Sequence, residues 1–426
     1  MTQPPPPLDT IVDEPSPLRR NRDYVVLTTG QMFEAVGSGM TGLALLLLAY
    51  DVTGSATLAG IVSAGFGLGQ FVMGLPAGAL VDRWDRKRIL ILTGVVLGVT
   101  MATIPLAAVV WRLTFAQLLM VSIVDGFAAA FVWPAGRAAL KSIVPPAQLG
   151  QAATVTQARM GVGALVGPAI AGALFAVSRA LPFVVNSLLM LAAAVGYRLV
   201  GHRLPAPERA PDAPPPHLFR DVRSGLAWVW RTKPVRDMVG VGLLLNLAAN
   251  GILTVAILAL QRDGVPPQAL GALESAAGAA AIVGALAASL VLKRVPVGVA
   301  AVAVIWLDAA LLALMPLSGS PWWVGLLFCA TVLTLPTINA GMGAFMMHIT
   351  PDAMQGRSGS AAGFVSMAMI PLATGAAGVL LEQVGRTGAL LVYVVVLGLA
   401  GALVSLSRHI RAIPRTDRFA EVPEAA

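Results

Sequence analysis

Twelve long apolar runs follow one another along this chain, and they constrain its fold more than any other feature. Six runs precede residue 201 and six follow residue 233, and each is about 20 residues or longer. That length is enough for an α-helix to cross a bilayer. The runs are Tyr24 to Tyr50, Leu58 to Val81, Ile89 to Val110, Thr114 to Leu140, Gln151 to Val177, Leu181 to Val200, Val235 to Leu260, Gln268 to Leu292, Val295 to Leu317, Trp322 to Met347, Gly359 to Leu381 and Gly388 to Ser407.

Composition excludes a soluble protein. Of 426 residues, 57% are hydrophobic and 12% are charged, which is more apolar surface than a soluble core of this length can bury. The prediction is an all-α membrane protein with 12 transmembrane helices. Its expected parts are a tail (1–23), a six-helix bundle (24–200), a linker (201–233), a second six-helix bundle (234–407) and a second tail (408–426).

Basic residues are distributed unequally between the two sides of this plan. Most of the 29 Lys and Arg residues fall in the tails, the linker and alternate loops. Cytoplasmic loops carry such an excess, so we expect a multi-pass protein of the cell inner membrane with both termini cytoplasmic. A net charge of +8 also suits nucleic acid, but no soluble basic domain is present to bind it. The expected external basic residues are Arg112, Arg179, Arg262 and Arg386.

The linker has a Pro-rich part, from Pro205 to Pro216, followed by an amphipathic part. At helical spacing the amphipathic part gathers its apolar side chains on one face, which predicts a helix on the inner membrane surface that joins the two bundles. The apolar side chains are Leu218, Phe219, Val222, Leu226, Val229 and Trp230.

An internal repeat relates the two halves. The octet from Ile143 to Gly150 matches the octet from Ile349 to Gly356 at four positions, and both follow the fourth run of their half. We therefore expect two parallel, pseudo-symmetric bundles related by an axis along the membrane normal.

The segment Gly78-Ala-Leu-Val-Asp82-Arg83-Trp-Asp85-Arg86-Lys87 resembles the signature loop of the Major Facilitator Superfamily. In that loop Gly, three residues, Asp, a basic residue and a basic pair recur; Asp85 stands where the family usually has Gly. The sequence is similar to that of bacterial drug and siderophore exporters. The resemblance extends over essentially the whole chain, including Asn21 to Tyr24 and Trp133 to Arg137. It implies a monomeric transporter rather than an enzyme.

The resemblance also implies a conformational latch. Asp82 would face the start of the eleventh helix, near Gly356 to Ser358, and hold the outward-facing state. Arg83, Arg86 and Arg137 would complete the latch, with Asp85 as its unusual member and Gly78 at its start.

The fifth run contains a glycine motif that is similar to the pattern of exporting antiporters in the family. Glycines four residues apart let another helix approach closely, and a proline bends the helix. The alternative interpretation is ordinary tight helix packing. The motif residues are Gly163, Gly167, Pro168 and Gly172.

Ionisable groups inside membrane spans are costly and mark functional candidates. Glu34 lies ten residues beyond Tyr24, about 15 Å along a helix, and Asp125 lies at a similar depth in the fourth run. Burial favours the protonated form of a carboxyl group, so such a group can carry a proton. In the family the first and fourth helices line the central cavity, which would bring Glu34 and Asp125 to a common space.

Four further polar residues are candidates for contact with a substrate. Arg159 would neutralise Asp125 or contact an anionic substrate, or form a structural pair on the cytoplasmic side. The alternative for Asp125 is a structural pair with Arg159 or Arg137. Gln31 would hydrogen-bond Glu34 if that acid is only structural, and Asn246 and Asn250, one turn apart, would bind substrate or join packed helices. We expect Asp308 to be structural and Glu274 to be hydrated.

The sequence thus predicts an exporter of small amphipathic compounds, such as drugs or natural products, by proton antiport with alternating access. Its partners would be the substrate, protons and the bilayer, with no cofactor beyond the proton gradient. No nucleotide-binding loop and no metal-ligand spacing of the four His residues is visible. An importer or uniporter of a metabolite is the alternative. An enzyme acting on lipid is not expected, because no His, Asp and Ser cluster marks the membrane surface.

Overall fold

The computed structural model describes residues 17–202 and 218–422, and within these ranges every regular element is a helix. Most of the expected N-terminal tail and the Pro-rich part of the linker lie outside the described residues. Proline inside a helix is accommodated in six of the long helices in the described chain without ending them, as membrane helices permit.

The first half contains six long helices, and short polar side chains cap the starts of four of them, including Asp85. Asn21, Ser55 and Thr114 each accept a hydrogen bond from a backbone N–H of the following turn. Such N-caps satisfy backbone donors that the helix leaves unpaired. The helices are α1 (Arg22–Thr53), α2 (Ala56–Val81), α3 (Arg86–Val110), α4 (Phe115–Ile143), α5 (Leu149–Val177) and α6 (Leu181–Leu199).

The second half follows a shorter helix, α7 (Leu218–Arg231), which packs against α8 and α12. Val229 of α7 is buried, whereas Trp230 is largely exposed. The long helices are α8 (Lys233–Arg262), α9 (Pro267–Arg294), α10 (Val297–Ala313), α11 (Pro321–Ile349) and α12 (Asp352–Leu406). A short helix, α13 (Arg408–Arg411), follows them.

Gly385 divides α12 into two spans. Its φ of 71° and ψ of −179° are not helical, and a positive φ at this turn favours glycine. Eleven helices in the described chain are long and apolar enough to cross a membrane, and the last of these, Gly363–Leu406, includes this break. The two spans expected from Gly359 to Leu381 and from Gly388 to Ser407 lie on either side of it.

The repeated octets occupy corresponding positions in the two halves. The helix α4 ends at Ile143, and α11 ends 206 positions later at Ile349. Each octet then leads into the next long helix, α5 or α12.

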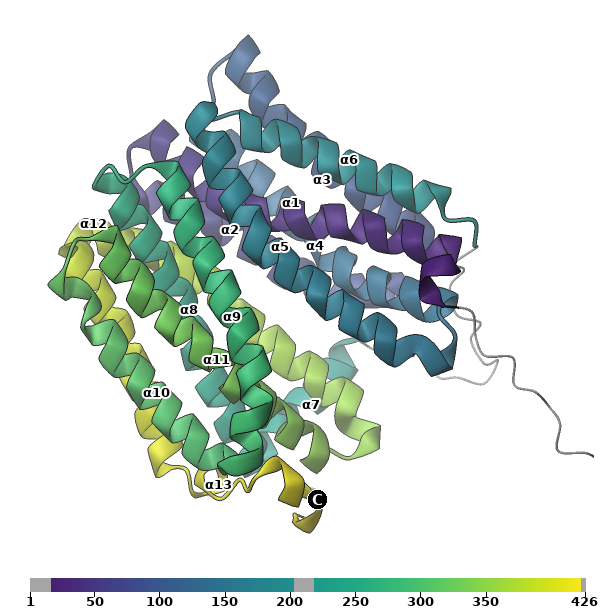
Figure 1. The fold of residues 1–426 in the computed structure, drawn as a ribbon, viewed down its shortest axis with the longest axis vertical. Helices are drawn as coiled ribbons and strands as arrows, with labels where there is room; N and C mark the ends of the chain where they lie inside the picture. The colour runs from purple at the N-terminus through teal and green to yellow at the C-terminus, as the bar shows by residue number, and fades with distance from the viewer. Residues whose placement is uncertain (1–16, 203–217, 423–426) are drawn as a thin grey trace, which may run out of the picture.

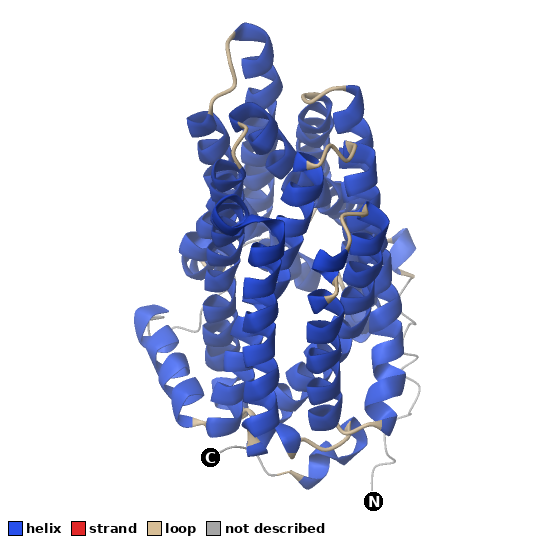
Figure 2. Cartoon of the chain, turned by 90° about the vertical axis from the view of Figure 1, so that its left-hand side faces the viewer, coloured by secondary structure: helices blue, strands red, loops and turns tan. Residues whose placement is uncertain are grey.

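The two halves form a V in Figure 1, with the arms joined at one end. The arms meet along two helix pairs, α2 with α12 and α5 with α9. We call the closed end, which carries Asp51, Ser55, Arg179, Gln261 and Glu382, the junction end. The opposite end, where α1 begins and α13 lies, is called the termini end; Figure 2 shows the same helices from the side.

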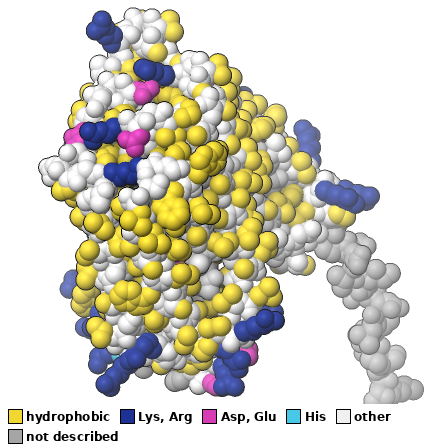
Figure 3. Space-filling view, turned by 60° about the vertical axis from the view of Figure 1, so that its left-hand side comes forward, with side chains coloured by type: hydrophobic (Ala, Val, Ile, Leu, Met, Phe, Trp, Pro, Cys, Tyr) yellow, Lys and Arg dark blue, Asp and Glu magenta, His cyan; other side chains and the backbone are white. Residues whose placement is uncertain are grey.

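Hydrophobic side chains cover the middle of the molecule on the face shown in Figure 3, and charged side chains gather towards its two ends. Large apolar side chains such as Leu106, Leu188 and Leu286 are more than half exposed. A soluble monomer rarely exposes so continuous an apolar surface, whereas a bilayer covers it. The chain is a multi-pass membrane protein.

Candidate functional site

Glu34 lies in a polar cluster inside the first half. It is 4% exposed, and Tyr197 of α6 donates a hydrogen bond of 2.8 Å from its hydroxyl to Oε2 of Glu34. The other carboxylate oxygen, Oε1, is buried and has no partner among the described residues. A carboxyl group that is satisfied on one side only retains a free position for a proton.

Gln31 and Arg159 complete this cluster, which we call the Glu34 cluster. Gln31 precedes Glu34 by one helical turn on α1, and Nη1 of Arg159 on α5 donates a hydrogen bond to Oε1 of Gln31. Gln31, Glu34 and Arg159 line one cavity of about 40 Å³. Arg159 therefore pairs with Gln31 and not with Asp125, and Gln31 does not hydrogen-bond Glu34.

Sequence reasoning missed Tyr197. It lies in the sixth apolar run with no motif around it, and it meets Glu34 only because α1 and α6 pack together. The fit is close: a Cβ added to Gly30 of α1 would lie 2.9 Å from the Tyr197 ring. The available signal was a phenol inside a membrane span.

Asp125 does not share a space with Glu34. It is 4% exposed and lines a separate cavity of about 110 Å³, together with residues of α1, α2, α3 and α6. The expectation that the two carboxylates face a common space is therefore wrong for this conformation, because the packing directs them into different gaps of the bundle.

The other polar candidates lie in the second half. The side-chain amides of Asn246 and Asn250 donate hydrogen bonds to backbone carbonyls of their own helix, α8, over 2.9 Å in both cases. Asp308 accepts a 2.8 Å hydrogen bond from Thr334, which agrees with a structural role. Glu274 lies on α9 and is half-buried.

The glycine motif of α5 packs against two different helices. Added Cβ atoms at Gly163 and Gly167 would lie 2.5 Å from the carbonyl oxygen of Ala35 and 2.6 Å from the carbonyl carbon of Gly39, both in α1. A Cβ at Gly172 would instead meet α9, 3.0 Å from Cα of Gly271. The motif therefore holds α5 against its own half and against the other half at once.

The signature loop forms the turn between α2 and α3. Asp85 caps α3 by accepting hydrogen bonds from the backbone N–H groups of Lys87 at 2.8 Å and Arg88 at 3.2 Å. A carboxylate at a helix N-terminus is favourable, which accounts for Asp85 in place of the usual glycine. Arg86 donates to Ser142 Oγ at 3.3 Å, so this loop is tied to α4.

Arg137 and Asp82 do not contact each other. The Arg137 guanidinium lies 5.7 Å from the centre of the Trp133 ring on the same helix. Asp82 is exposed at the end of α2, and its carboxylate forms no hydrogen bond or ion pair within the described chain.

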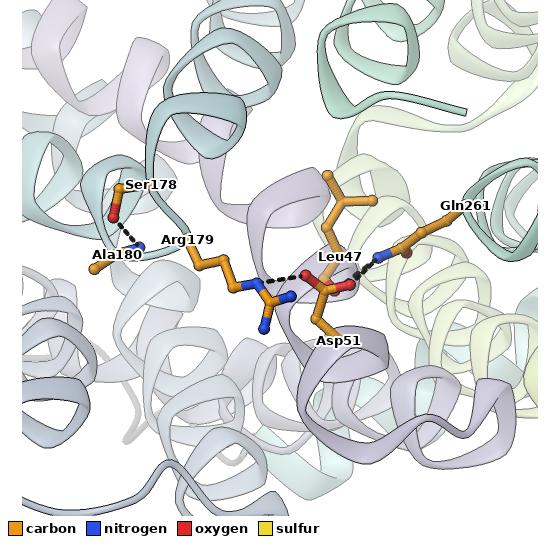
Figure 4. A network of polar contacts seen from close by, with 6 residues as sticks. All are labelled: Leu47, Asp51, Ser178, Arg179, Ala180 and Gln261. Atoms are coloured by element: carbon orange, nitrogen blue, oxygen red, sulfur yellow. Dashed lines mark hydrogen bonds and ion pairs between the residues drawn. The ribbon is translucent and has the colours of Figure 1, made fainter. Parts of the chain in front are cut away.

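Polar contacts close the junction end between the halves. Asp51 at the end of α1 pairs with Arg179 of the α5–α6 turn at 3.0 Å. Gln261 of α8 donates to Asp51 Oδ1 at 3.1 Å and to the carbonyl oxygen of Leu47 at 2.9 Å (Figure 4). Asp51 thus links its own half to the other half.

A second junction contact places a carboxylate of one half on a helix start of the other. Glu382 of α12 accepts hydrogen bonds from Ser55 Oγ at 2.7 Å, Thr57 Oγ1 at 2.6 Å and the backbone N–H of Thr57 at 3.1 Å. Glu382 therefore caps the N-terminus of α2 across the interface.

Residues 27–374 match the family model described as the Major Facilitator Superfamily. The chain belongs to the Major Facilitator Superfamily. Members of this superfamily are transporters and not enzymes, and the two parallel halves seen here are the arrangement expected of them.

Among similar proteins, the multidrug efflux pump Tap of Mycolicibacterium fortuitum is 26% identical over 385 residues, which cover 85% of this chain and 88% of Tap. Macrolide efflux protein A of Streptococcus pyogenes is 25% identical over 222 residues. That match covers 52% of this chain, and the chain spans only 54% of the macrolide protein.

Solved structures share the fold. A bacterial homologue of the human lysosomal transporter Spinster, in an inward-facing and unoccupied conformation, superposes with a TM-score of 0.71 at 15% identity, covering 93% of this chain and 98% of that one. A bacterial homologue of the iron transporter ferroportin, in an inward-facing state, gives a TM-score of 0.68 at 13% identity and covers 89% and 98%.

Proposed function

We propose that this superfamily member exports small amphipathic compounds by proton antiport, with Glu34 as the proton carrier. The observation that carries the proposal is the Glu34 cluster: a carboxyl group buried at the middle of a span, held by Tyr197 on one oxygen and unpaired on the other. Arg159 and Gln31 lie in the same cavity, so a change in the charge of Glu34 acts directly on their contacts. The efflux function of distant relatives supports the direction of transport.

The conformation fits one half of an alternating-access cycle. If the termini end is cytoplasmic, as the distribution of basic residues indicates, the closed junction end is external and this is the inward-facing state. The inward-facing state of the superposed Spinster homologue agrees with this assignment.

The signature loop fits the same cycle. The Asp82 carboxylate has no partner within the described chain, as expected for a latch that holds only the outward-facing state. The side chains of its proposed target, Gly356 to Ser358, are not among those that the structure describes. Arg83, Arg86 and Arg137 stay as proposed members of the latch.

The test is Glu34→Gln, which keeps the shape and removes the proton site. In everted membrane vesicles or proteoliposomes, we expect the variant to lose substrate-induced proton flux and uphill export while still exchanging substrate down its gradient. Substrates to screen are hydrophobic cations, macrolides, tetracyclines and siderophores.

The matched control is Asp308→Asn, because Asp308 is a buried acid in the other half that is held by Thr334. In a cell assay, we expect the exporting protein to lower substrate accumulation, and we expect a protonophore to abolish that effect. Uphill export that persists in a correctly inserted Glu34→Gln protein would contradict the proposal, and substrate accumulation driven by the protein would favour an importer.

A further inference from the structure

The cavity at Asp125 is an oxygen-lined space inside the first half. Its volume of about 110 Å³ exceeds the roughly 10 to 15 Å³ that one water needs. The walls come from α1, α2, α3, α4 and α6, so the cavity is enclosed by one bundle. Its polar lining residues are Ser38, Thr41, Ser63, Ser122, Asp125 and Asn186.

Asp125 is unpaired in this cavity. It is 4% exposed, and its carboxylate forms no hydrogen bond or ion pair with any residue that the structure describes. No other residue that lines the cavity is ionisable. An ionised carboxylate at this depth is costly unless a proton neutralises it or a bound cation compensates its charge.

The surrounding hydrogen bonds leave acceptors in the cavity. Asn186 is 2% exposed and donates from Nδ2 to Thr41 Oγ1 at 2.7 Å. Its Oδ1 is buried without a hydrogen-bond partner and lies against Gly37 of α1, where an added Cβ would clash with it. Thr41 in turn donates to the carbonyl oxygen of Gly37 at 3.0 Å, and Ser122 donates to the carbonyl oxygen of Val62. Both hydroxyl hydrogens are committed to the backbone, so the remaining lone pairs of these oxygens are free to accept.

We propose that Asp125 and these neutral oxygens bind a monovalent cation of the size of Na⁺. Carboxylate, amide and hydroxyl oxygens are the ligands of hard cations, and a single carboxylate balances one positive charge. A divalent ion would leave an uncompensated charge in the bundle. The inference goes beyond the proposed proton antiport and does not depend on it, because binding is measured without transport.

The experiment measures thermal unfolding of the full-length protein in nanodiscs at pH 8 and constant ionic strength. The salts compared are NaCl, KCl and choline chloride. A ligand that binds only the folded protein raises its unfolding midpoint with ligand concentration. We expect NaCl to raise the midpoint in this way, and choline chloride to leave it unchanged. Asp125→Asn should lose the response to Na⁺, whereas Asp308→Asn should keep it.

A second measurement covers the case in which Asp125→Asn does not fold. Ser63 lines the cavity and its hydroxyl forms no hydrogen bond with the described residues, so Ser63→Ala should fold while weakening ²²Na⁺ binding by about tenfold. Equal midpoints in NaCl and choline chloride, or an unchanged Na⁺ response in Asp125→Asn, would overturn the inference and leave the proton as the ion of Asp125.

Discussion

At the scale of single residues, two buried tyrosines make the same packing contact with a glycine in the two halves, but their hydroxyl groups have different partners. Tyr197 packs against Gly30 and donates to the Glu34 carboxylate, whereas Tyr393 packs against Gly251 and donates to the backbone carbonyl of Ala373 at 2.7 Å. The packing is alike, but only Tyr197 acts on a group that can take up a proton.

Tyr197→Phe should therefore alter coupling rather than assembly. The hydroxyl donates to the ionised form of Glu34, so its loss should move the pH of half-maximal export to higher values, with protein yield retained. The measurement is the pH dependence of export from proteoliposomes. Tyr393→Phe is the matched control, and an equal displacement in both variants would contradict a specific role for Tyr197.

At the scale of elements, α5 is the helix that packs both within its own half and against the other half. Gly163 and Gly167 allow it to touch α1 within its half, while Gly172 allows it to touch α9 across the junction. The same motif thus contributes both to folding of the first half and to closure of the junction end.

Gly163→Ala and Gly172→Ala should have different effects. Crowding at Gly163 acts within one bundle and should cost about 1 to 3 kcal/mol of folding stability, seen as a lower unfolding midpoint. Crowding at Gly172 opposes closure of the junction and should instead favour the opposite conformation. Gly242→Ala on α8 is the control, because an added Cβ there meets no atom within 4 Å. A smaller loss of folding stability for Gly163→Ala than for Gly242→Ala would contradict the proposal that Gly163 acts on folding and Gly172 on conformation.

At the scale of the whole molecule, two carboxylates lie at opposite ends of α2. Glu382 caps its N-terminus from the other half, and Asp82 stands unpaired at its C-terminus. If each carboxylate stabilises one conformation, they act in opposite directions on the same equilibrium. A carboxylate at a helix N-terminus contributes about 0.3 to 1 kcal/mol when exposed, which is enough to shift populations severalfold.

Glu382→Gln should shift the protein away from the conformation in which the junction end is closed. Asp82→Asn should shift it towards that conformation. Spin labels at the exposed positions Lys141 and Lys293, on the two halves at the termini end, report the change. Their distance should shorten in Glu382→Gln and lengthen on average in Asp82→Asn. Cys329 is replaced by Ala first. Shifts in the same direction for both variants would contradict opposed latches.

Much of the fold was predictable because spans and turns depend on local composition. Apolar runs of about 20 residues must form helices in lipid, and the repeated octets fall at the predicted helix joins, after Ile143 and Ile349. The helix merged across Gly385 shows the limit of local rules, since one glycine with positive φ separates two spans. The role of Asp85 as a cap was also not evident from its departure from the family pattern.

The sequence by itself determined the membrane class, the twofold plan, the family and the presence of costly buried charges, because each depends on residue type and spacing along one helix. Only the tertiary structure decided which charges meet. Glu34 and Asp125 have similar depths in their spans, yet the rotation of each helix turns Glu34 to Tyr197 and Asp125 to a cavity of its own. Packing across the whole bundle sets the rotation of each helix about its axis and the helices that it contacts. The spacing of residues along one segment does not determine either of these.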